Sequence, residues 1–323
     1  MPEAQRDMPA ASGEFDIIRD FFAGAKKNSE GVVLGIGDDC ALLRPPAEGV
    51  LATSVDTLVA DRHFPAGADP VAVAARALRV NLSDLAAMNA RPLWFTLALT
   101  LPHSDVDWLR AFSRGLLETA ARYGISLVGG DTTRGPLSIT IQVTGISECP
   151  LRRDGASAGD AVYVSGSLGA AAAALPVILG QQPAAESTRR EAEHVFYFPE
   201  PQLSLSESIG GLASSALDIS DGLLTDLGHI CAASGVSADI DMQALPVAPL
   251  AQQLAGEGAA ALAAGGGDDY QLCFTVPPEN IPQLELLGLD VTRIGRIVEG
   301  AGEVRAWRDG ERWIPQACGY QHF

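Results

Sequence analysis

The stretch Gly35-Ile36-Gly37-Asp38-Asp39-Cys40-Ala41-Leu42-Leu43 sets two adjacent carboxylates after a short apolar run and a pair of glycines. Most of the other notable aspartates also follow an apolar run, beside Gly, Ser or Thr, in Ser54-Val55-Asp56, Asn81-Leu82-Ser83-Asp84, Gly129-Gly130-Asp131-Thr132-Thr133, Asp218-Ile219-Ser220-Asp221-Gly222 and Gly265-Gly266-Gly267-Asp268-Asp269-Tyr270. Open α/β sheets build their ligand sites in loops at strand ends. We therefore predict an α/β fold in which several of these aspartates converge.

The size and charge of the chain narrow the possible classes. Its 323 residues, 47% of them hydrophobic, are enough for two domains that each bury a core. The net charge of −18 argues against nucleic acid or an anionic membrane surface as a partner, since both select basic patches. An acidic protein that binds a phosphorylated ligand needs positive charge between the two, and divalent cations would supply it.

The sequence shows no targeting segment that we recognise, and its cysteines are not arranged for disulfide or zinc binding. Met1–Gly13 lacks a basic segment followed by an apolar one, and the longest apolar tract, Leu168–Leu179, is interrupted by Pro176. We expect neither a signal peptide nor a membrane span. The cysteines are odd in number, widely spaced and never in a CxxC pair (Cys40, Cys149, Cys231, Cys273 and Cys318). This pattern is typical of reduced cysteines in a cytoplasmic protein, without a disulfide framework or a zinc site.

Lysine is almost absent, which excludes several nucleotide-binding classes. Lys26 and Lys27 are the only lysines, and neither lies in a GxxxxGK[ST] loop or in a kinase-like strand. A P-loop NTPase and a protein kinase are therefore not expected. The same scarcity argues against Schiff-base chemistry.

The first half of the chain alternates helical and strand periodicity. Helices are predicted at 14–28, 70–88 and 105–123, and strands at 32–36, 50–58, 93–101, 125–128 and 137–146. Asp69 and Pro70 supply the N-cap and first position of the second helix. Turn-forming residues follow, so we place a domain boundary near Glu148 and predict domains at 1–148 and 149–323.

The second half also alternates. Strands are predicted at 160–165, 215–219, 270–276 and 291–298, and helices after the 166–169 loop, at 202–212, from 222 to about 233, and at 279–287. The helix N-terminus after 166–169 is a weak candidate for holding an anion. Trp307, Trp313, Tyr320 and Phe323 near the end are expected to be packing residues.

The aspartates predict metal-assisted chemistry if they share one cleft. Unpaired carboxylates there would repel one another, so the cleft must hold cations. An oxygen-only ligand set favours Mg²⁺ or Ca²⁺, but the 218–222 spacing does not fit an EF-hand. Several Mg²⁺ ions suit ATP-dependent phosphoryl transfer. The alternative for single residues is ordinary: Asp84 as a solvated helix residue, Gly129-Gly130-Asp131 as a plain turn and Arg153 as a solvated linker residue.

Five motifs resemble the thiamine-monophosphate kinase family, which belongs to the superfamily of aminoimidazole ribonucleotide synthetase. They are GIGDDCALL, NLSDLAAM, GGDTTRGPLSIT, LDISDGLLTDLGHI and GGGDDYQLCFTV, in the family order, and the resemblance runs from about Gly13 to the end. It implies a two-domain α/β (α+β) fold whose N-terminal sheet domain forms a homodimer. It also implies ATP and Mg²⁺-dependent phosphorylation of thiamine monophosphate to thiamine diphosphate.

The resemblance assigns roles by motif. The implied Mg²⁺ ligands are Asp39, Ser54, Val55 through its backbone or side chain, Asp56, Asp84, Asp131, Asp218 and Asp221. The implied ATP contacts are Gly130, Asp131, Arg153 and Ser220, and the implied substrate contacts are His63, Asp268 and Tyr320. Val55 stands where the family often has Thr, and Asp268 where it commonly has Glu, which shortens the reach to the substrate by one methylene.

No general base is assigned. A phosphate monoester has a second pKa near 6, so its oxygen is already largely anionic at neutral pH and can attack ATP directly. Positioning and metal neutralisation would then carry catalysis. Three alternatives stay open: another ATP-dependent enzyme of the superfamily, a Mg²⁺-dependent phosphohydrolase, and a metal-binding protein without catalytic activity.

Overall fold

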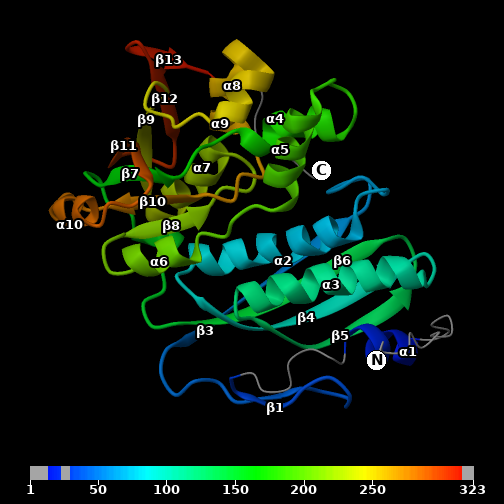
Figure 1. Ribbon diagram of the computed structural model, residues 1–323. Helices are drawn as coiled ribbons and strands as arrows, with labels where there is room; N and C mark the ends of the chain where they lie inside the picture. The colour runs from blue at the N-terminus through cyan, green and yellow to red at the C-terminus, as the bar shows by residue number, and fades with distance from the viewer. Residues whose placement is uncertain (1–13, 23–29, 315–323) are drawn as a thin grey trace. The chain divides into compact units, whose positions relative to one another are not determined.

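The computed structural model describes residues 14–22 and 30–314, and Tyr320 and Cys318 lie outside these residues. The chain divides into two compact units, which are described separately. The first comprises 1–81 and 92–146, and the second comprises 82–91 and 147–323. The division falls between Asn81 and Leu82, inside the continuous helix α2 (Pro70–Ala87). Each unit combines helices with a sheet, so the predicted mixed α/β class is confirmed (Figure 1).

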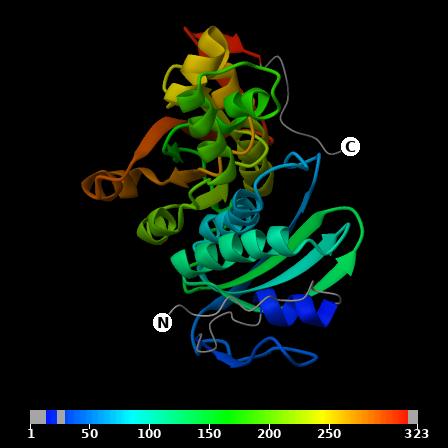
Figure 2. The same ribbon diagram turned by 45° about the vertical axis from the view of Figure 1, so that its right-hand side comes forward.

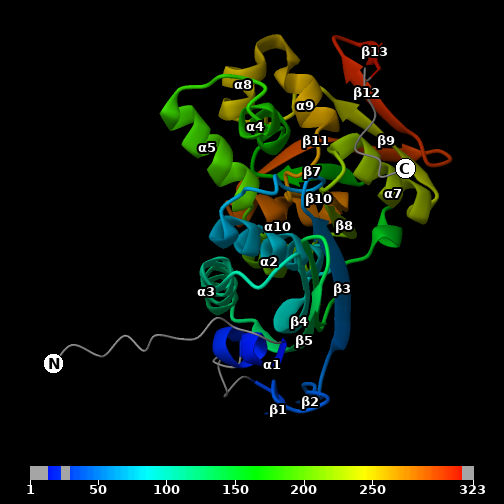
Figure 3. The ribbon, with the colours of Figure 1, turned by 90° about the vertical axis from the view of Figure 1, so that its right-hand side faces the viewer.

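The first unit is built on a four-stranded sheet. Its strand order is β3 (Val50–Val59), β6 (Ser138–Ser147), β4 (Arg91–Leu101) and β5 (Ser126–Arg134). Helices α2 and α3 (Val106–Arg122) lie on the same side of this sheet (Figure 3). The described residues begin with α1 (Glu14–Ile17) and a π-helical turn (Ile18–Phe22), and β1 (Val32–Leu34) pairs antiparallel with β2 (Leu42–Leu43).

The two long helices begin where capping chemistry predicts. The Asp69 carboxylate accepts the Val71 N–H at 3.0 Å, and Pro70 occupies the first position of α2. Asp105 caps α3 by accepting the N–H groups of Asp107 and Trp108. The helices approach closely because Gly115 has no side chain, since a Cβ there would lie 2.6 Å from the Val71 carbonyl oxygen. Both predicted helices are confirmed to within about two residues.

The second unit is built on a seven-stranded sheet of order β13-β12-β9-β11-β7-β10-β8. The strands are β7 (Ala161–Ser165), β8 (Ser215–Asp218), β9 (Val236–Asp241), β10 (Leu272–Val276), β11 (Val291–Glu299), β12 (Val304–Arg308) and β13 (Glu311–Trp313). Among the pairings described within this seven-stranded sheet, only β12–β9 is parallel. The central strands β7 and β10 are buried along their whole length, as expected for strands covered on both faces.

Two apolar layers cover this sheet. One face packs Val162, Val164, Leu217 and Cys273 against α7 (Leu223–Ser234), and the other packs Tyr163, Phe274 and Ala216 with the end of α2. The remaining helices are α4 (Ala170–Ile178), α5 (Glu186–Tyr197), α6 (Leu203–Ile209), α8 (Pro249–Ala255), α9 (Ala259–Gly265) and α10 (Ile281–Leu286). The green and yellow helices α4, α5, α8 and α9 gather together through small alanine-rich contacts (Figures 1 and 2).

Candidate active site

Strand β3 separates three of the predicted metal ligands by face. Ser54 and Asp56 are half-buried, and the Asp56 N–H donates to the Asn81 side chain of α2 at 3.1 Å. Val55, between them, points to the opposite face and is 58% exposed. Ser54 and Asp56 therefore share the helix-covered face, and only the Val55 backbone carbonyl can bind a cation.

His63 and Asp39 lie in loops of the first unit. The His63 Nδ1 accepts the Val59 N–H at 3.0 Å, so in the neutral ring Nε2 carries the hydrogen. In this tautomer the group with which His63 can donate is Nε2–H. Asp39 lies between β1 and β2 with its side chain exposed, and its N–H donates to the Asp38 carboxylate at 2.8 Å.

Gly130 and Asp131 lie within β5, although the predicted strand ends at Val128. The prediction of a loop here was wrong because the parallel pairing of Gly130 with Leu97 and Asp131 with Ala98 extends the strand. Strands β5 and β3 form opposite edges of the sheet, separated by two strands. At a spacing of about 4.8 Å per strand, the edges are roughly 14 Å apart. Within this unit Asp131 and Asp56 are therefore not neighbours.

In the second unit, the Asp218 and Asp84 carboxylates lie close enough for their negative charges to interact. Asp218 is the last residue of β8 and is 7% exposed. Burial first, and then the negative charge of Asp84, raise the pKa of its carboxyl to about 7. Ser83 lies close enough to offset part of this effect, yet its buried Oγ forms no hydrogen bond of normal geometry within the described residues.

The turn after Asp218 is held by Asp226, which sequence reasoning missed. The Asp226 carboxylate accepts the N–H groups of Ser220, Asp221 and Gly222, each at 3.0 Å. Burial raises the pKa of Asp226 to about 6, and these hydrogen bonds oppose the rise. The sequence feature that could have identified Asp226 is its position in the first turn of α7, where a carboxylate can accept the unpaired backbone N–H groups of a helix start.

The loop at 265–270 packs against that turn. The Asp268 N–H donates to the Ser220 carbonyl and the Tyr270 N–H to the Ile219 carbonyl, both at 2.8 Å. The Tyr270 hydroxyl donates to the Asp268 carboxylate at 3.1 Å. Tyr270 was also missed, because a tyrosine after two aspartates carries no signal beyond packing. The structure thus brings Ser220 and Asp268 together.

Asp269, next to Asp268, has a separate role. Its carboxylate accepts the Gly169 N–H at 2.7 Å, at the start of α4. The helix N-terminus considered as an anion site is therefore occupied by a side chain of the protein itself.

Arg153 begins a short 3-10 turn (Arg153–Gly155), and the carbonyl of the preceding Arg152 accepts the Ala216 N–H of β8. Arg153 is exposed, and its carbonyl accepts the hydroxyl of Ser234, the last residue of α7. The Asp221 turn precedes the other end of this 12-residue helix, which is roughly 18 Å long. The Tyr320 assignment lies outside the described residues.

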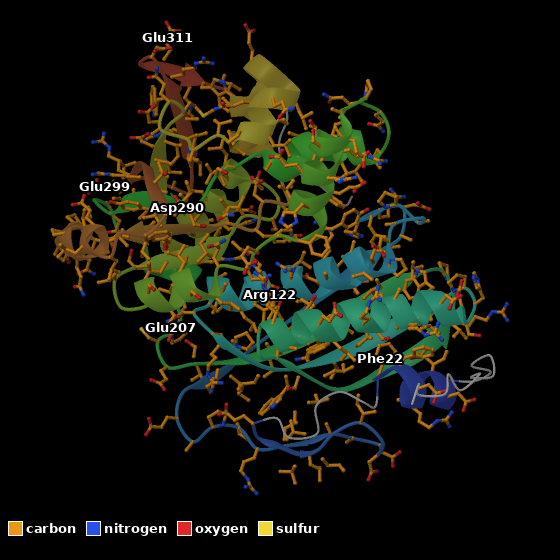
Figure 4. All side chains as sticks on the ribbon, in the orientation of Figure 1. Phe22, Arg122, Glu207, Asp290, Glu299 and Glu311 are labelled. Atoms are coloured by element: carbon orange, nitrogen blue, oxygen red, sulfur yellow. The ribbon has the colours of Figure 1, made fainter. Side chains whose placement is uncertain are left out.

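The residues present fit a cation, although the ligand set stays a prediction. The buried Asp218 carboxyl beside Asp84 is electrostatically unfavourable when both are charged, and a divalent cation would relieve that repulsion. Within 14–22 and 30–314, no group of three or more His, Cys, Asp or Glu side chains is close enough to hold a metal. The four acidic residues labelled in Figure 4 within the second unit, Glu207, Asp290, Glu299 and Glu311, are exposed and do not belong to this pair.

Comparison with known proteins decides the family. Residues 37–148 match the AIR synthase related protein N-terminal domain, and residues 157–308 match the C-terminal domain of the same name. Thiamine-monophosphate kinase of Escherichia coli strain K12 is 43% identical over 323 residues, covering 97% of this chain and 99% of that protein. The chain belongs to the thiamine-monophosphate kinase family. The predicted resemblance is thereby confirmed.

Solved structures of the thiamine-monophosphate kinase family share the fold. The enzyme from Stenotrophomonas maltophilia K279a has 42% identity and a TM-score of 0.79, covering 87% of this chain and 92% of that one. AaThiL complexed with AMPPCP and TMP has 32% identity and a TM-score of 0.78, covering 89% and 92%. Hydrogenase maturation protein HypE, at 22% identity and a TM-score of 0.71, shows the fold alone. In the described ranges no helix has the length and apolar character of a membrane span.

Proposed function

We propose that this chain transfers the γ-phosphoryl group of ATP directly to thiamine monophosphate, giving thiamine diphosphate and ADP, with several Mg²⁺ ions. The observation that carries the proposal is the near full-length match to thiamine-monophosphate kinases, 43% identical over 97% of the chain. A related protein, 32% identical, was solved as a complex with AMPPCP and TMP. In that relative, this fold therefore accommodates AMPPCP and TMP together.

The proposed Mg²⁺ ligands come from several separate segments of the chain. Asp218, Asp84 and Asp221 would contribute from the second unit, and Ser54 and Asp56 from the helix-covered face of β3. Asp39, Asp131 and the Val55 carbonyl complete the proposed set, in which Asp131 and Asp56, on opposite edges of their sheet, would hold different ions. When bound, Mg²⁺ would neutralise charge on the phosphate oxygens and orient the reacting groups for in-line transfer.

The acceptor needs binding rather than activation. His63 would donate its Nε2 hydrogen to the phosphate of thiamine monophosphate, because Nδ1 is already engaged by Val59. Asp268, oriented by Tyr270, would contact the same substrate, and Tyr320 is proposed to complete its binding. No side chain is assigned as a base, since the acceptor phosphate is already anionic near neutral pH.

ATP is proposed to bind through Gly130, Asp131, Arg153 and the Ser220 hydroxyl. Ser220 can use only its side chain for this contact, because Asp226 occupies its N–H. Arg153 is exposed, so its guanidinium is accessible to a phosphate or a ring.

The chain is also proposed to act as a cytoplasmic homodimer formed through the first unit. Large apolar side chains are unusually exposed there, on β1, β2 and β3: Val33, Leu34, Leu42, Leu43, Val50, Leu51 and Val55. Clustered exposed apolar residues on an edge strand mark an interaction surface. A second copy of the same surface would cover them symmetrically.

The test is an acceptor panel with purified protein, ATP and Mg²⁺. ADP formation is measured with thiamine monophosphate, with unphosphorylated thiamine and with no acceptor. We expect ADP release only with the monophosphate, matched by thiamine diphosphate. Equal release in all three reactions would instead identify a phosphohydrolase, and binding of Mg²⁺ without any turnover would identify a metal-binding protein.

A further inference from the structure

The Asp226 carboxylate has an unusual set of partners. One of its oxygens, Oδ2, accepts N–H groups from three consecutive residues, Ser220, Asp221 and Gly222, each at 3.0 Å. The residue is 4% exposed, so these hydrogen bonds are shielded from water. Hydrogen bonds to a charged acceptor are about twice as strong as neutral ones, and burial strengthens them further. Asp226 therefore fixes the backbone of this turn.

The bonds also determine what the turn can bind. Successive backbone N–H groups that converge form a concavity that commonly holds an anion such as phosphate. Here the Asp226 side chain already fills that concavity. The turn consequently offers a phosphate no backbone N–H from 220–222, and its remaining polar groups are oxygens that suit a cation.

The 218–222 turn also supports the loop that carries Asp268. The Ser220 carbonyl accepts the Asp268 N–H at 2.8 Å, and a Cβ on Gly267 would lie 2.4 Å from the same oxygen. A Cβ on Gly222 would lie 2.6 Å from the Gly265 carbonyl. The two backbones are packed without room for a side chain, so a displaced turn would move Asp268 as well.

We propose that Asp226 is a positioning residue that holds the 218–222 turn for cation binding and, through that turn, places Asp268 for the acceptor. This proposal rests on the proposed kinase function. Asp226 is assigned no direct contact with substrate or metal, because its hydrogen-bond partners are backbone N–H groups of the turn. Its loss therefore weakens metal binding and acceptor binding together, without removing a ligand of either.

The test compares Asp226→Asn with Asp160→Asn in the full-length protein. Asn keeps the size of the side chain but offers only a neutral oxygen to the three N–H groups. Asp160 is a matched control: it is 3% exposed and its carboxylate accepts the Ser157 N–H and the Ser214 hydroxyl, before β7 and away from the turn. Binding of Mn²⁺ is measured by electron paramagnetic resonance, and amide hydrogen exchange is followed in the peptide that contains 219–222.

We expect Asp226→Asn to weaken Mn²⁺ binding about tenfold, to speed exchange in that peptide and to raise the KM for thiamine monophosphate, while Asp160→Asn changes none of these. Unchanged Mn²⁺ affinity in Asp226→Asn, or equal losses in both variants, would overturn the proposal. If Asp226→Asn does not fold, Asp226→Glu, which keeps the charge but displaces the turn, is expected to fold with the same weakened Mn²⁺ binding, and unchanged binding would overturn it. Weakened Mn²⁺ binding in Asp226→Asn, found together with a wild type that forms no thiamine diphosphate, would reject the kinase function but leave the positioning role.

Discussion

At the scale of single residues, burial of the Asp269 carboxyl group makes the stability of the fold depend on pH. Burial raises its pKa to about 7 from an ordinary value of 3.8, and the N–H groups at the start of α4 offset only part of that rise. A carboxyl group whose pKa is higher in the folded state stabilises the fold below the ordinary pKa and loses that contribution as pH rises through the folded value. The relevant window is therefore about pH 4 to 7.

Asp269→Asn should remove this pH dependence, because asparagine does not titrate. We expect the melting temperature of the wild type, relative to the variant, to be higher at pH 5 than at pH 8. Differential scanning calorimetry of both proteins at the two pH values measures this difference. A difference that stays constant between pH 5 and pH 8 would contradict the assignment.

A substitution at His63 distinguishes a role in substrate binding from a role as general base. In His63→Asn the amide oxygen can still accept the Val59 N–H, while the group that Nε2 provides is lost. We expect the KM for thiamine monophosphate to rise about tenfold, with little change in kcat or in its pH profile. A large fall in kcat together with loss of the acidic limb of the profile would instead make His63 a general base.

Sequence identified the site aspartates as a class but not their separate roles. Asp268 and Asp269 are adjacent and chemically identical, yet one faces the 218–222 turn and the other anchors α4. Asp226 was missed because its three partners are backbone groups, which leave no mark in a side-chain pattern. Such roles depend on where the folded backbone places each carboxylate.

At the scale of elements, the β4–β5 pairing depends on Gly130. A Cβ at this position would lie 1.9 Å from the Leu97 carbonyl oxygen, whereas at Gly129 the nearest atom would be the Thr96 methyl at 3.9 Å. We expect Gly130→Ala to destabilise the first unit by about 3 kcal/mol, because the strands must move apart.

The matched variant Gly129→Ala should be tolerated, since its contact is an ordinary one. Urea unfolding of the two variants, followed by circular dichroism, gives the comparison. Equal stability of both variants would show that β5 does not pack against β4 as described.

Long elements with a clear period were predictable, and short ones set by tertiary contacts were not. Helices α2 and α3 carry caps and apolar spacing that sequence reveals directly. Strand β9, by contrast, follows α7 after a single glycine, and β12 joins it in parallel across a long sequence separation. Neither was predicted, because their pairing partners rather than their own residues define them.

At the scale of the whole molecule, the exposed apolar strand predicts self-association. Leu51 on β3 is 50% exposed, and Leu51→Lys would place a charge within the proposed dimer surface. We expect this variant to sediment as a monomer where the wild type sediments as a dimer. Leu286→Lys is the control, because Leu286 is 86% exposed on α10 of the second unit and should not affect the dimer. A monomeric wild type, or dissociation by both variants, would contradict this surface.

The family and the mixed α/β class followed from motifs spread over the chain, because each sets polar or acidic residues beside an apolar stretch. The predicted boundary near Glu148 and the ligand assignments stay predictions. Helix α2 contributes residues to both units, and sequence contains no marker for a division inside a continuous helix.

The central claim is direct transfer from ATP to thiamine monophosphate, and ³¹P nuclear magnetic resonance of the complete reaction tests it most directly. We expect the monophosphate resonance to be replaced by the two resonances of thiamine diphosphate, with one ADP formed for each product molecule. Accumulation of inorganic phosphate, with the monophosphate resonance unchanged, would contradict the account.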